Sequence, residues 1–170
     1  GYVPIVGAAT RAAMATWPTG RPIRILEAAR ELTLEVIVRI MFGLDDTVDA
    51  AEVARIGKPF DALLVLAISD ETPVRYAARR LGALRFWGRL GALNRRIDDV
   101  VLPLIAARRA DPGRPAGILG MLVDARGEDG ECLSAKEIRD DLVTPVLAGH
   151  EPTATTLAWV VDLLLHPPEG

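Results

Sequence analysis

Hydrophobic residues recur at helical spacing along most of this chain. The clearest run covers residues 25–42, where apolar side chains repeat every three or four positions and charged side chains fill the opposite face. Gly43 follows directly and is placed to end the helix. The pattern predicts an amphipathic helix with one buried face. Its apolar positions are Leu26, Ala29, Leu32, Val36, Ile37, Ile40 and Met41, and its charged positions are Glu27, Arg30, Glu31, Glu35 and Arg39.

The same spacing predicts helices on both sides of this one. They cover residues 3–15, 49–67, 73–109 and 117–126. Thr72 and Pro73 form a favourable helix start, with an N-cap hydroxyl followed by a proline in the first turn. Pro59 and Pro103 lie inside predicted helices, and we expect each to bend the helix that contains it.

The last predicted helix begins with a capping box, Ser134-x-x-Glu137. Its apolar positions continue to His166, where two prolines stop it. The segments 110–117 and 127–132 have the glycine, proline and aspartate content of a loop and a turn. No segment alternates convincingly between apolar and polar residues, so the fold class predicted is mainly α.

Composition narrows the classes of function. The 170 residues are rich in Ala, Leu and Val, suffice for one domain, and carry a formal net charge of −3, which gives no general case for nucleic-acid binding. Cys132 is the only cysteine, so an internal disulfide and a cysteine-rich zinc site are excluded. His150 and His166 are too far apart to share a metal. With no secretory signal and no apolar run of membrane-spanning length, we expect a cytoplasmic protein without a transmembrane segment.

Seven arginines and no acid lie between Thr72 and Asp98. Such a cluster indicates either a patch for an acidic partner or the solvated face of a long helix. The solvated face is the simpler interpretation. The arginines are Arg75, Arg79, Arg80, Arg85, Arg89, Arg95 and Arg96.

The stretch 147–156 raises a question of chemistry, because Gly149, Glu151 and Pro152 interrupt an apolar helix. A carboxylate there is costly unless it is paired or used for proton transfer. Small residues at 148 and 149 would let a large flat group approach the backbone. The residues alone leave two alternatives open: a site of this kind, or close helix packing with Glu151 paired to an arginine.

At this stretch the sequence resembles cytochrome P450, the haem-thiolate monooxygenase family. That family's long central helix carries Ala/Gly-Gly-x-Asp/Glu-Thr, and "AGHEPTATTLAW" (148–159) follows the pattern. The flanking "ARGEDGECLSAKEIRDDLVTPVLAGHE" is similar to the loop and entry that precede that motif. "LTLEVIVRIMFGLD" (32–45) and "VVLPLIAARRADPG" (100–113) are similar to earlier family helices, in the expected order.

The resemblance implies the helical portion of the P450 fold, incomplete at both ends, with residues 1–170 as a single partial domain that ends after the oxygen-binding helix. It implies haem b (iron protoporphyrin IX) as cofactor and insertion of one oxygen atom from O2 into a small organic substrate. A ferredoxin or flavoprotein reductase would supply electrons. By this resemblance Ala148 and Gly149 would lie against the porphyrin, Glu151 would relay protons, and Thr144 and Leu147 would face substrate.

Two departures from the family pattern matter. The family's haem-ligating cysteine loop is absent, and so is the Glu-x-x-Arg helix that precedes that loop. Cys132 is in the wrong place to substitute, so these residues alone would not hold haem through a thiolate. Pro152 stands where the family has threonine. Thr153 is the neighbouring candidate hydroxyl, although it points about 100° further round the helix.

A non-enzymatic interpretation competes with this one. An all-helical ligand-binding or interaction domain without haem would explain the helices and the arginines. It would not explain why several family-like segments follow one another in the expected order.

Overall fold

The computed structural model describes residues 1–45, 47–68, 82–114, 116–128 and 130–166. The helices in this part of the chain are α1 (Val3–Thr16), α2 (Ile25–Phe42), α3 (Ala50–Ile68), α5 (Gly82–Ala110), α6 (Gly117–Asp124) and α7 (Ala135–Leu165). The described residues thus confirm a mainly α fold. Within them, no helix combines the length and the apolar content needed to cross a membrane.

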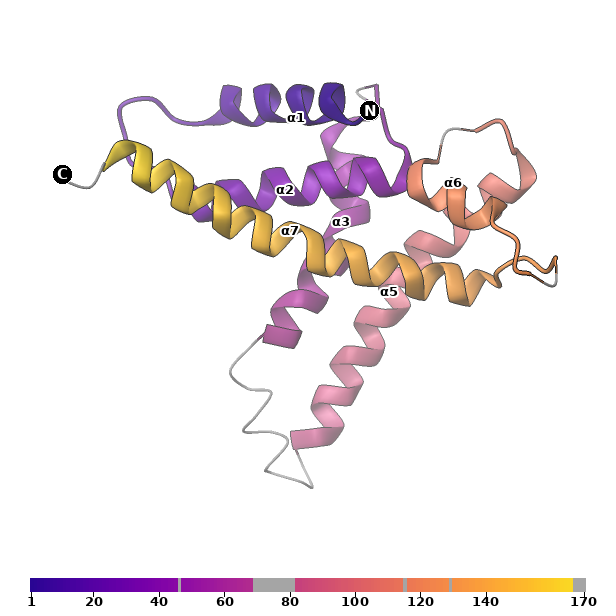
Figure 1. The fold of residues 1–170 in the computed structure, drawn as a ribbon. Coiled ribbons are helices and arrows are strands. Elements are labelled where there is room, and N and C mark those ends of the chain that lie inside the picture. The colour runs from indigo at the N-terminus through magenta and orange to yellow at the C-terminus, as the bar shows by residue number, and fades with distance from the viewer. Residues whose placement is uncertain (46, 69–81, 115, 129, 167–170) are drawn as a thin grey trace.

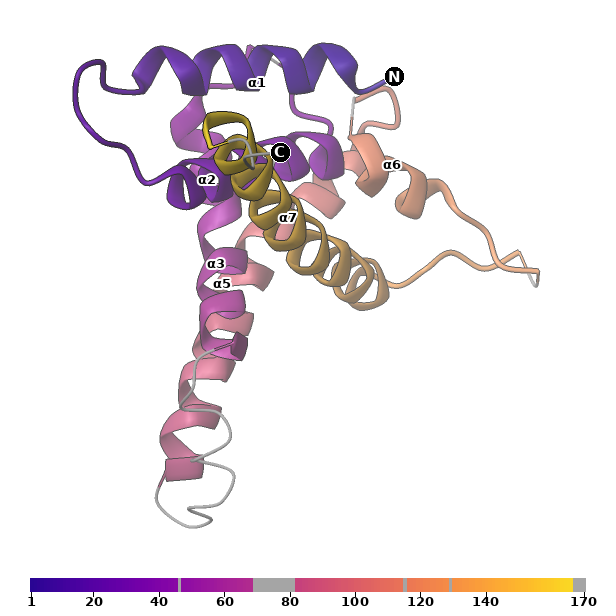
Figure 2. The same cartoon turned by 60° about the vertical axis from the view of Figure 1, so that its left-hand side comes forward.

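Helices α2 and α7 form the centre of the molecule, and α2 contacts α7 more extensively than it contacts any other helix. Figure 1 shows α1 lying along the outer side of α2, while α3 and α5 extend away from the centre as a neighbouring pair. The view in Figure 2 shows the same pair projecting together. Helix α6 packs beside the C-terminal end of α2.

The core lies where five of the helices meet. Phe60 of α3 is fully buried, and its ring centroid lies 6.2 Å from that of Phe42 at the end of α2. Such tilted aromatic pairs add to the stabilisation that area burial provides. The other large, fully buried apolar side chains come from α2, α3, α5, α6 and α7: Met41, Ile56, Ile97, Ile105, Leu119, Ile138, Leu142, Val38, Val101 and Val146.

Most predicted helix ends are confirmed within one residue. Gly43 ends α2 in the left-handed conformation, with φ of 66°. The capping box at the start of α7 is present: the Glu137 amide donates to Ser134 Oγ (3.2 Å) and the Ser134 amide donates to Glu137 Oε2 (2.8 Å). The start predicted at Thr72 and Pro73, and the two prolines after His166, lie outside the described residues.

Helix α6 ends at Asp124, two residues earlier than the predicted 126. Ala125 already has an extended backbone, and Arg126 forms an antiparallel β-bridge with Cys132. Beside this bridge the Gly127 amide donates to the Glu131 carbonyl (2.9 Å), so the chain is paired across the turn instead of continuing the helix.

Arg39 corrects the predicted polar face of α2, because it is buried although the pattern placed it toward solvent. Its Nε donates to Glu35 Oε1 (2.9 Å), and its other nitrogens donate to the carbonyls of Asp45 (2.6 Å) and Val48 (3.2 Å). A buried guanidinium is tolerated when its donors are satisfied in this way. Arg39 thus fastens the loop that follows α2.

The prolines at 145 and 152 do not end α7, which runs as one helix through both. Each proline removes the amide that would bond the carbonyl four residues earlier, at Asp141 and Ala148. Both of those residues are exposed, so water can reach that face of the helix. A solvated carbonyl carries little of the penalty of a buried unpaired one, which explains why the helix continues.

Helices α2 and α6 approach so closely that only glycine fits at the crossing. A Cβ built on Gly117 would lie 2.1 Å from the carbonyl oxygen of Ile40, and one on Gly43 would lie 2.2 Å from the Gly117 amide nitrogen. Both glycines have positive φ. The end of α2 and the start of α6 therefore meet backbone to backbone.

We expect Gly117→Ala to lower the free energy of unfolding by about 3 kcal/mol or more, because left-handed strain and a clash with backbone act together. Urea denaturation monitored by circular dichroism measures the loss. Gly20→Ala is the matched control, since Gly20 has φ of +73° but open space around its Cβ position. It should lose only about 1–2 kcal/mol. Equal losses in the two variants would contradict the close crossing.

Candidate functional site

One strip of α7 is left uncovered by the other described helices. Its exposed residues recur every three or four positions: Thr144, Ala148, Pro152, Thr155 and Trp159. The opposite side of the helix is buried, in a row spaced by four: Ile138, Leu142, Val146, His150 and Ala154. Of the residues predicted for the site, Thr144 and Ala148 lie on the exposed strip, and Leu147 lies half-buried at its edge.

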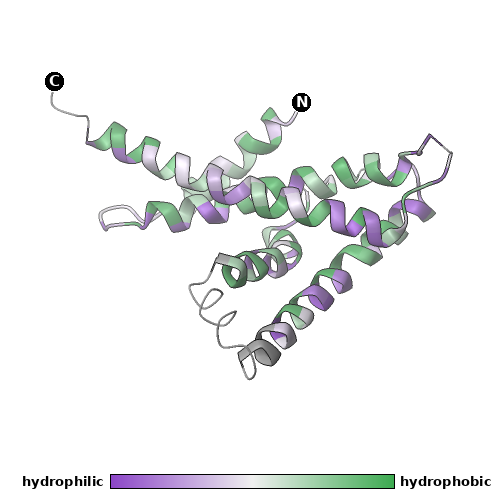
Figure 3. Ribbon diagram, turned by 60° about the horizontal axis from the view of Figure 1, so that its bottom comes forward, coloured by the Kyte–Doolittle hydropathy of each residue, from purple (hydrophilic) through white to green (hydrophobic). Residues whose placement is uncertain are grey.

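The strip becomes strongly apolar toward the end of α7. Trp159 is 64% exposed, and Leu163, one turn further along the same side, is 53% exposed. The ribbon next to the C-terminus is largely green, the colour of hydrophobic residues, in Figure 3. Isolated exposed apolar residues are ordinary, but a contiguous patch marks a surface that binds something apolar.

Glu151 lies at the flank of this strip and is held by Arg30 of α2. The guanidinium contacts both carboxylate oxygens: Nε lies 2.9 Å from Oε2, and Nη2 lies 2.5 Å from Oε1. The side chains of Arg30 and Glu151 are 40% and 22% exposed. Hydrogen bonding to Glu151 raises the pKa of Arg30 above its ordinary value, against the opposing effect of burial. The sequence-level alternative in which an arginine pairs with Glu151 is therefore realised.

Thr33 makes a second contact between α2 and the same turn of α7. Its hydroxyl lies 3.1 Å from the carbonyl oxygen of His150 and 2.9 Å from that of Ala29 in its own helix. His150 is buried, and its Nδ1 lies 2.9 Å from the carbonyl oxygen of Val146. Two consecutive residues of α7, His150 and Glu151, are thus contacted by two residues one helical turn apart on α2.

Gly149 and Ala148 face different neighbours. A Cβ built on Gly149 would lie 3.5 Å from Cδ1 of Ile37, which is ordinary van der Waals contact with α2. Ala148 is exposed on the open strip. Close approach of a flat group to α7 is therefore open at Ala148, whereas the absent side chain of Gly149 points toward packed protein.

Thr153 uses its hydroxyl within the helix. Its Oγ1 donates to the carbonyl oxygen of Gly149 (2.7 Å), and Thr156 Oγ1 donates in the same way to that of Pro152 (2.9 Å). Pro152 itself offers neither an amide nor a hydroxyl. Position 152 of the strip, next to Glu151, therefore has no hydroxyl, and that of the neighbouring Thr153 is bonded to the Gly149 carbonyl.

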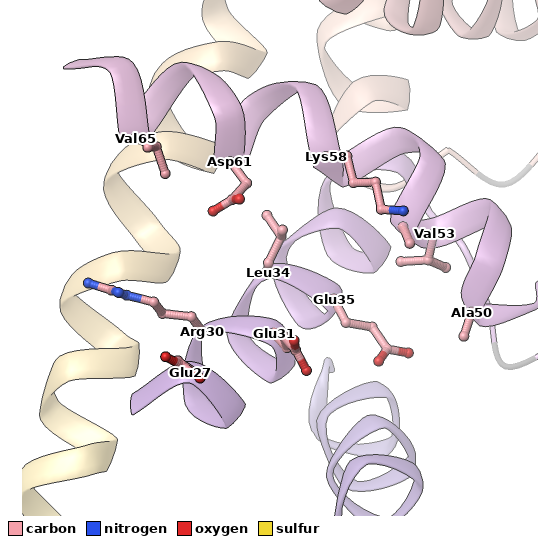
Figure 4. Close-up of a pocket in the computed structure, with 11 residues that line it drawn as sticks. Glu27, Arg30, Glu31, Leu34, Glu35, Ala50, Val53, Lys58, Asp61 and Val65 are labelled. Carbon is pink, nitrogen blue, oxygen red and sulfur yellow. The ribbon is translucent and has the colours of Figure 1, made fainter. Parts of the chain in front are cut away.

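A cavity of about 560 Å³ lies elsewhere, between α2 and α3 (Figure 4). Leu34, Val53 and Val65 give it apolar walls, and Glu27, Glu31, Glu35 and Asp61 make its lining acidic. Arg30 also lines it, and Figure 4 shows the guanidinium extending toward α7. Arg30 therefore connects this cavity with Glu151.

Cys132 is exposed and lies in the turn before α7. Within the described ranges, no cluster of three or more His, Cys, Asp or Glu side chains could hold a metal ion. Of the arginines between 72 and 98, those at 89, 95 and 96 are described and exposed, in agreement with a solvated helix face. The others either lie outside the described residues or have no described side chain.

Sequence reasoning missed Arg30 and Thr33, although both carried a signal. The helical pattern puts Arg30 on the charged face of its helix and predicts no role for Thr33. A threonine between Leu32 and Leu34, and an acid within the apolar last helix, each need a polar partner when they are buried. The sequence could indicate that need, but it could not indicate which helix supplies the partner.

Comparison with known proteins places this geometry in a family. A family model described as Cytochrome P450 matches residues 2–170. "Putative cytochrome P450 137" of Mycobacterium tuberculosis is 59% identical over 171 residues, which cover 99% of this chain and 35% of that protein. "Putative cytochrome P450 138" of Mycobacterium bovis is 33% identical over 99% of this chain and 37% of that protein.

A solved structure has the same fold. "Crystal structure of cytochrome P450DA heme domain" superposes with a TM-score of 0.62 and 22% identity, over 98% of this chain and 35% of that one. The chain therefore spans about a third of the length of the relatives it matches. The likeness covers all six helices named above and confirms the helical portion of the fold that the sequence predicted.

We expect Gly149→Ala to raise the free energy of unfolding by about 0.5–1 kcal/mol, because alanine is the better helix former and its Cβ meets Ile37 at ordinary distance. Urea denaturation checks this. Gly57→Ala in α3 is the comparison. Its Cβ would lie 3.3 Å from Leu34 and Val38, so this variant should gain less stability than Gly149→Ala. A loss of stability in Gly149→Ala would mean that α2 and α7 are packed more tightly there.

Proposed function

This chain belongs to the cytochrome P450 family, and we propose that it forms the central, oxygen-binding part of a longer haem monooxygenase. The reaction is insertion of one oxygen atom from O2 into a small organic substrate. The observation that carries the proposal is the exposed strip of α7, with Ala148 on it and Glu151 at its flank, within a motif that matches the family. The competing interpretation, a helical ligand-binding domain without haem, leaves that match unexplained.

The residues of the strip suit one face of haem b. Ala148 and Pro152 are compact and exposed, and Trp159 and Leu163 extend the apolar surface beyond them. Cys132 does not suit the role of iron ligand, because α7 alone separates Ala135 from Ala148 by about 20 Å. We therefore propose that a cysteine outside this chain ligates the iron. When bound, haem supplies the redox chemistry that reduces O2, with electrons from a ferredoxin or a flavoprotein reductase.

Glu151 is the residue we propose to move protons into the site. A carboxylate at the flank of the strip can exchange protons with water on one side and with the haem pocket on the other. Thr153 remains the candidate hydroxyl beside it, with a rotation of its side chain needed to leave the Gly149 carbonyl. Thr144 and Leu147, about two turns and one turn before Glu151, would contact substrate. Ala148 would border the porphyrin, whereas Gly149, which the family pattern also placed there, faces Ile37 of α2.

The experiment places residues 1–170 in the matching segment of the Mycobacterium tuberculosis relative, loads the full-length chimera with haem, reduces it and adds carbon monoxide. We expect the Soret band typical of thiolate-ligated haem. Ala148→Leu should lower the amount of haem bound per protein, because the larger side chain would occupy the space beside α7 that the haem needs. Gly149→Ala should leave the amount of bound haem unchanged. A chimera that folds but shows no thiolate-type band would overturn the haem-enzyme proposal.

Pro152→Thr should lower the fraction of consumed electrons that is released as peroxide several-fold in the same holoenzyme, because it supplies the missing hydroxyl beside Glu151. Peroxide and NADH are measured in parallel. Pro152→Ala is the matched control, since it restores the amide without the hydroxyl and should change the fraction little. Equal effects of the two substitutions would show that the hydroxyl is not what the site lacks.

A further inference from the structure

The turn of α7 that contains Glu151 has weak internal support. Pro152 offers no amide to the Ala148 carbonyl, and the next proline upstream, Pro145, has already removed another intrahelical bond. Helix geometry alone therefore fixes the direction of the Glu151 side chain less firmly than in an uninterrupted helix. Contacts from a neighbouring element gain importance at such a point.

Helix α2 supplies those contacts at two adjacent positions. Arg30 donates hydrogen bonds to both carboxylate oxygens of Glu151, and the Thr33 hydroxyl donates to the carbonyl of His150. A bidentate guanidinium–carboxylate pair fixes direction as well as distance. Since Thr33 is buried and three residues beyond Arg30, the two contacts act on the same turn from the same face of α2.

Two further carboxylates lie in the surroundings of Arg30. Asp61 of α3 and Glu27 of α2 act on Arg30 electrostatically, and both line the cavity between those helices. Figure 4 shows these carboxylates on either side of the arginine stem. The cavity is open to solvent and reaches Arg30, so a small cation could enter the space if the arginine side chain were removed.

We propose that Arg30 and Thr33 are positioning residues that hold the Glu151 turn of α7, so that the carboxylate stays at the flank of the exposed strip. This inference rests on the proposed function, since it is there that the direction of Glu151 matters. Arg30 acts through Glu151 and does not touch the reacting atoms.

The first measurement is amide hydrogen exchange in the full-length chimera before haem is added. Thr33→Val and Arg30→Gln should each make the α7 segment around Glu151 exchange about threefold faster or more, because a local contact is lost. Arg55→Gln is the matched control. Arg55 also contacts both oxygens of a glutamate, Glu52, but within a single helix on the surface. Unchanged exchange in both test variants would overturn the inference.

The second measurement is chemical rescue in the haem-loaded chimera. Arg30→Ala should raise the fraction of electrons released as peroxide about threefold or more. Guanidinium ion at a non-denaturing concentration should then reverse much of that rise, by entering through the cavity and pairing with Glu151. Arg30→Lys should fall between Arg30→Ala and the parent, because it keeps the charge and loses the bidentate geometry.

Rescue distinguishes positioning from a structural role. Guanidinium should have no effect on the parent, on Arg55→Ala, or on the double variant Arg30→Ala with Glu151→Gln. An unchanged or lower peroxide fraction in Arg30→Ala, or equal rescue of the double variant, would overturn the inference. A missing thiolate-type band would instead overturn the proposed function. The hydrogen-exchange result would still test the contacts of Arg30 and Thr33, because it is measured before haem is added.

Discussion

Helix α7 is held along one face by a buried row of side chains spaced by four, and this row determines what the rest of the helix can do. Ridges of this spacing pack into the grooves of neighbouring helices. The row extends from Ile138 to Ala154 without a break. Near its start, Arg139 fastens α7 to α5 through Asp98 (2.7 Å) and Asn94 (2.6 Å). Because the buried row and the Arg139 contacts hold one face of α7, the opposite face can stay uncovered without loosening the helix.

That division between a packed face and an open face explains the two prolines. Each lies off the buried row, and each leaves unpaired a carbonyl that belongs to an exposed residue. The energetic loss is therefore a solvated carbonyl and not a buried one. A proline at a row position such as Val146 would have disrupted the packing as well as the hydrogen bonding. The open face can consequently carry two prolines next to a candidate site.

Glu151 illustrates how a packing interpretation and a chemical one can both describe the same residue. Its pairing with Arg30 satisfies a carboxylate inside an apolar helix, which would otherwise be costly. Because both partners remain partly exposed, the pair is screened and its net contribution to stability is small. The pair is better understood as fixing geometry. A carboxylate held in one direction, close to water and to an open apolar strip, is suited to proton transfer.

The helices, their order and the capping box of α7 followed from the sequence, because apolar spacing and local hydrogen bonding are properties of neighbouring residues. The family pattern around Ala148 was readable for the same reason. The burial of Arg39, the early end of α6 at a bridge with Cys132, and the partners of Glu151 and His150 were decided by tertiary structure. Each depends on groups distant in the sequence, over 100 residues apart for Arg30 and Glu151. Spacing along one helix indicates that a buried acid needs a partner, but only the packing of α2 against α7 determines which arginine lies within reach.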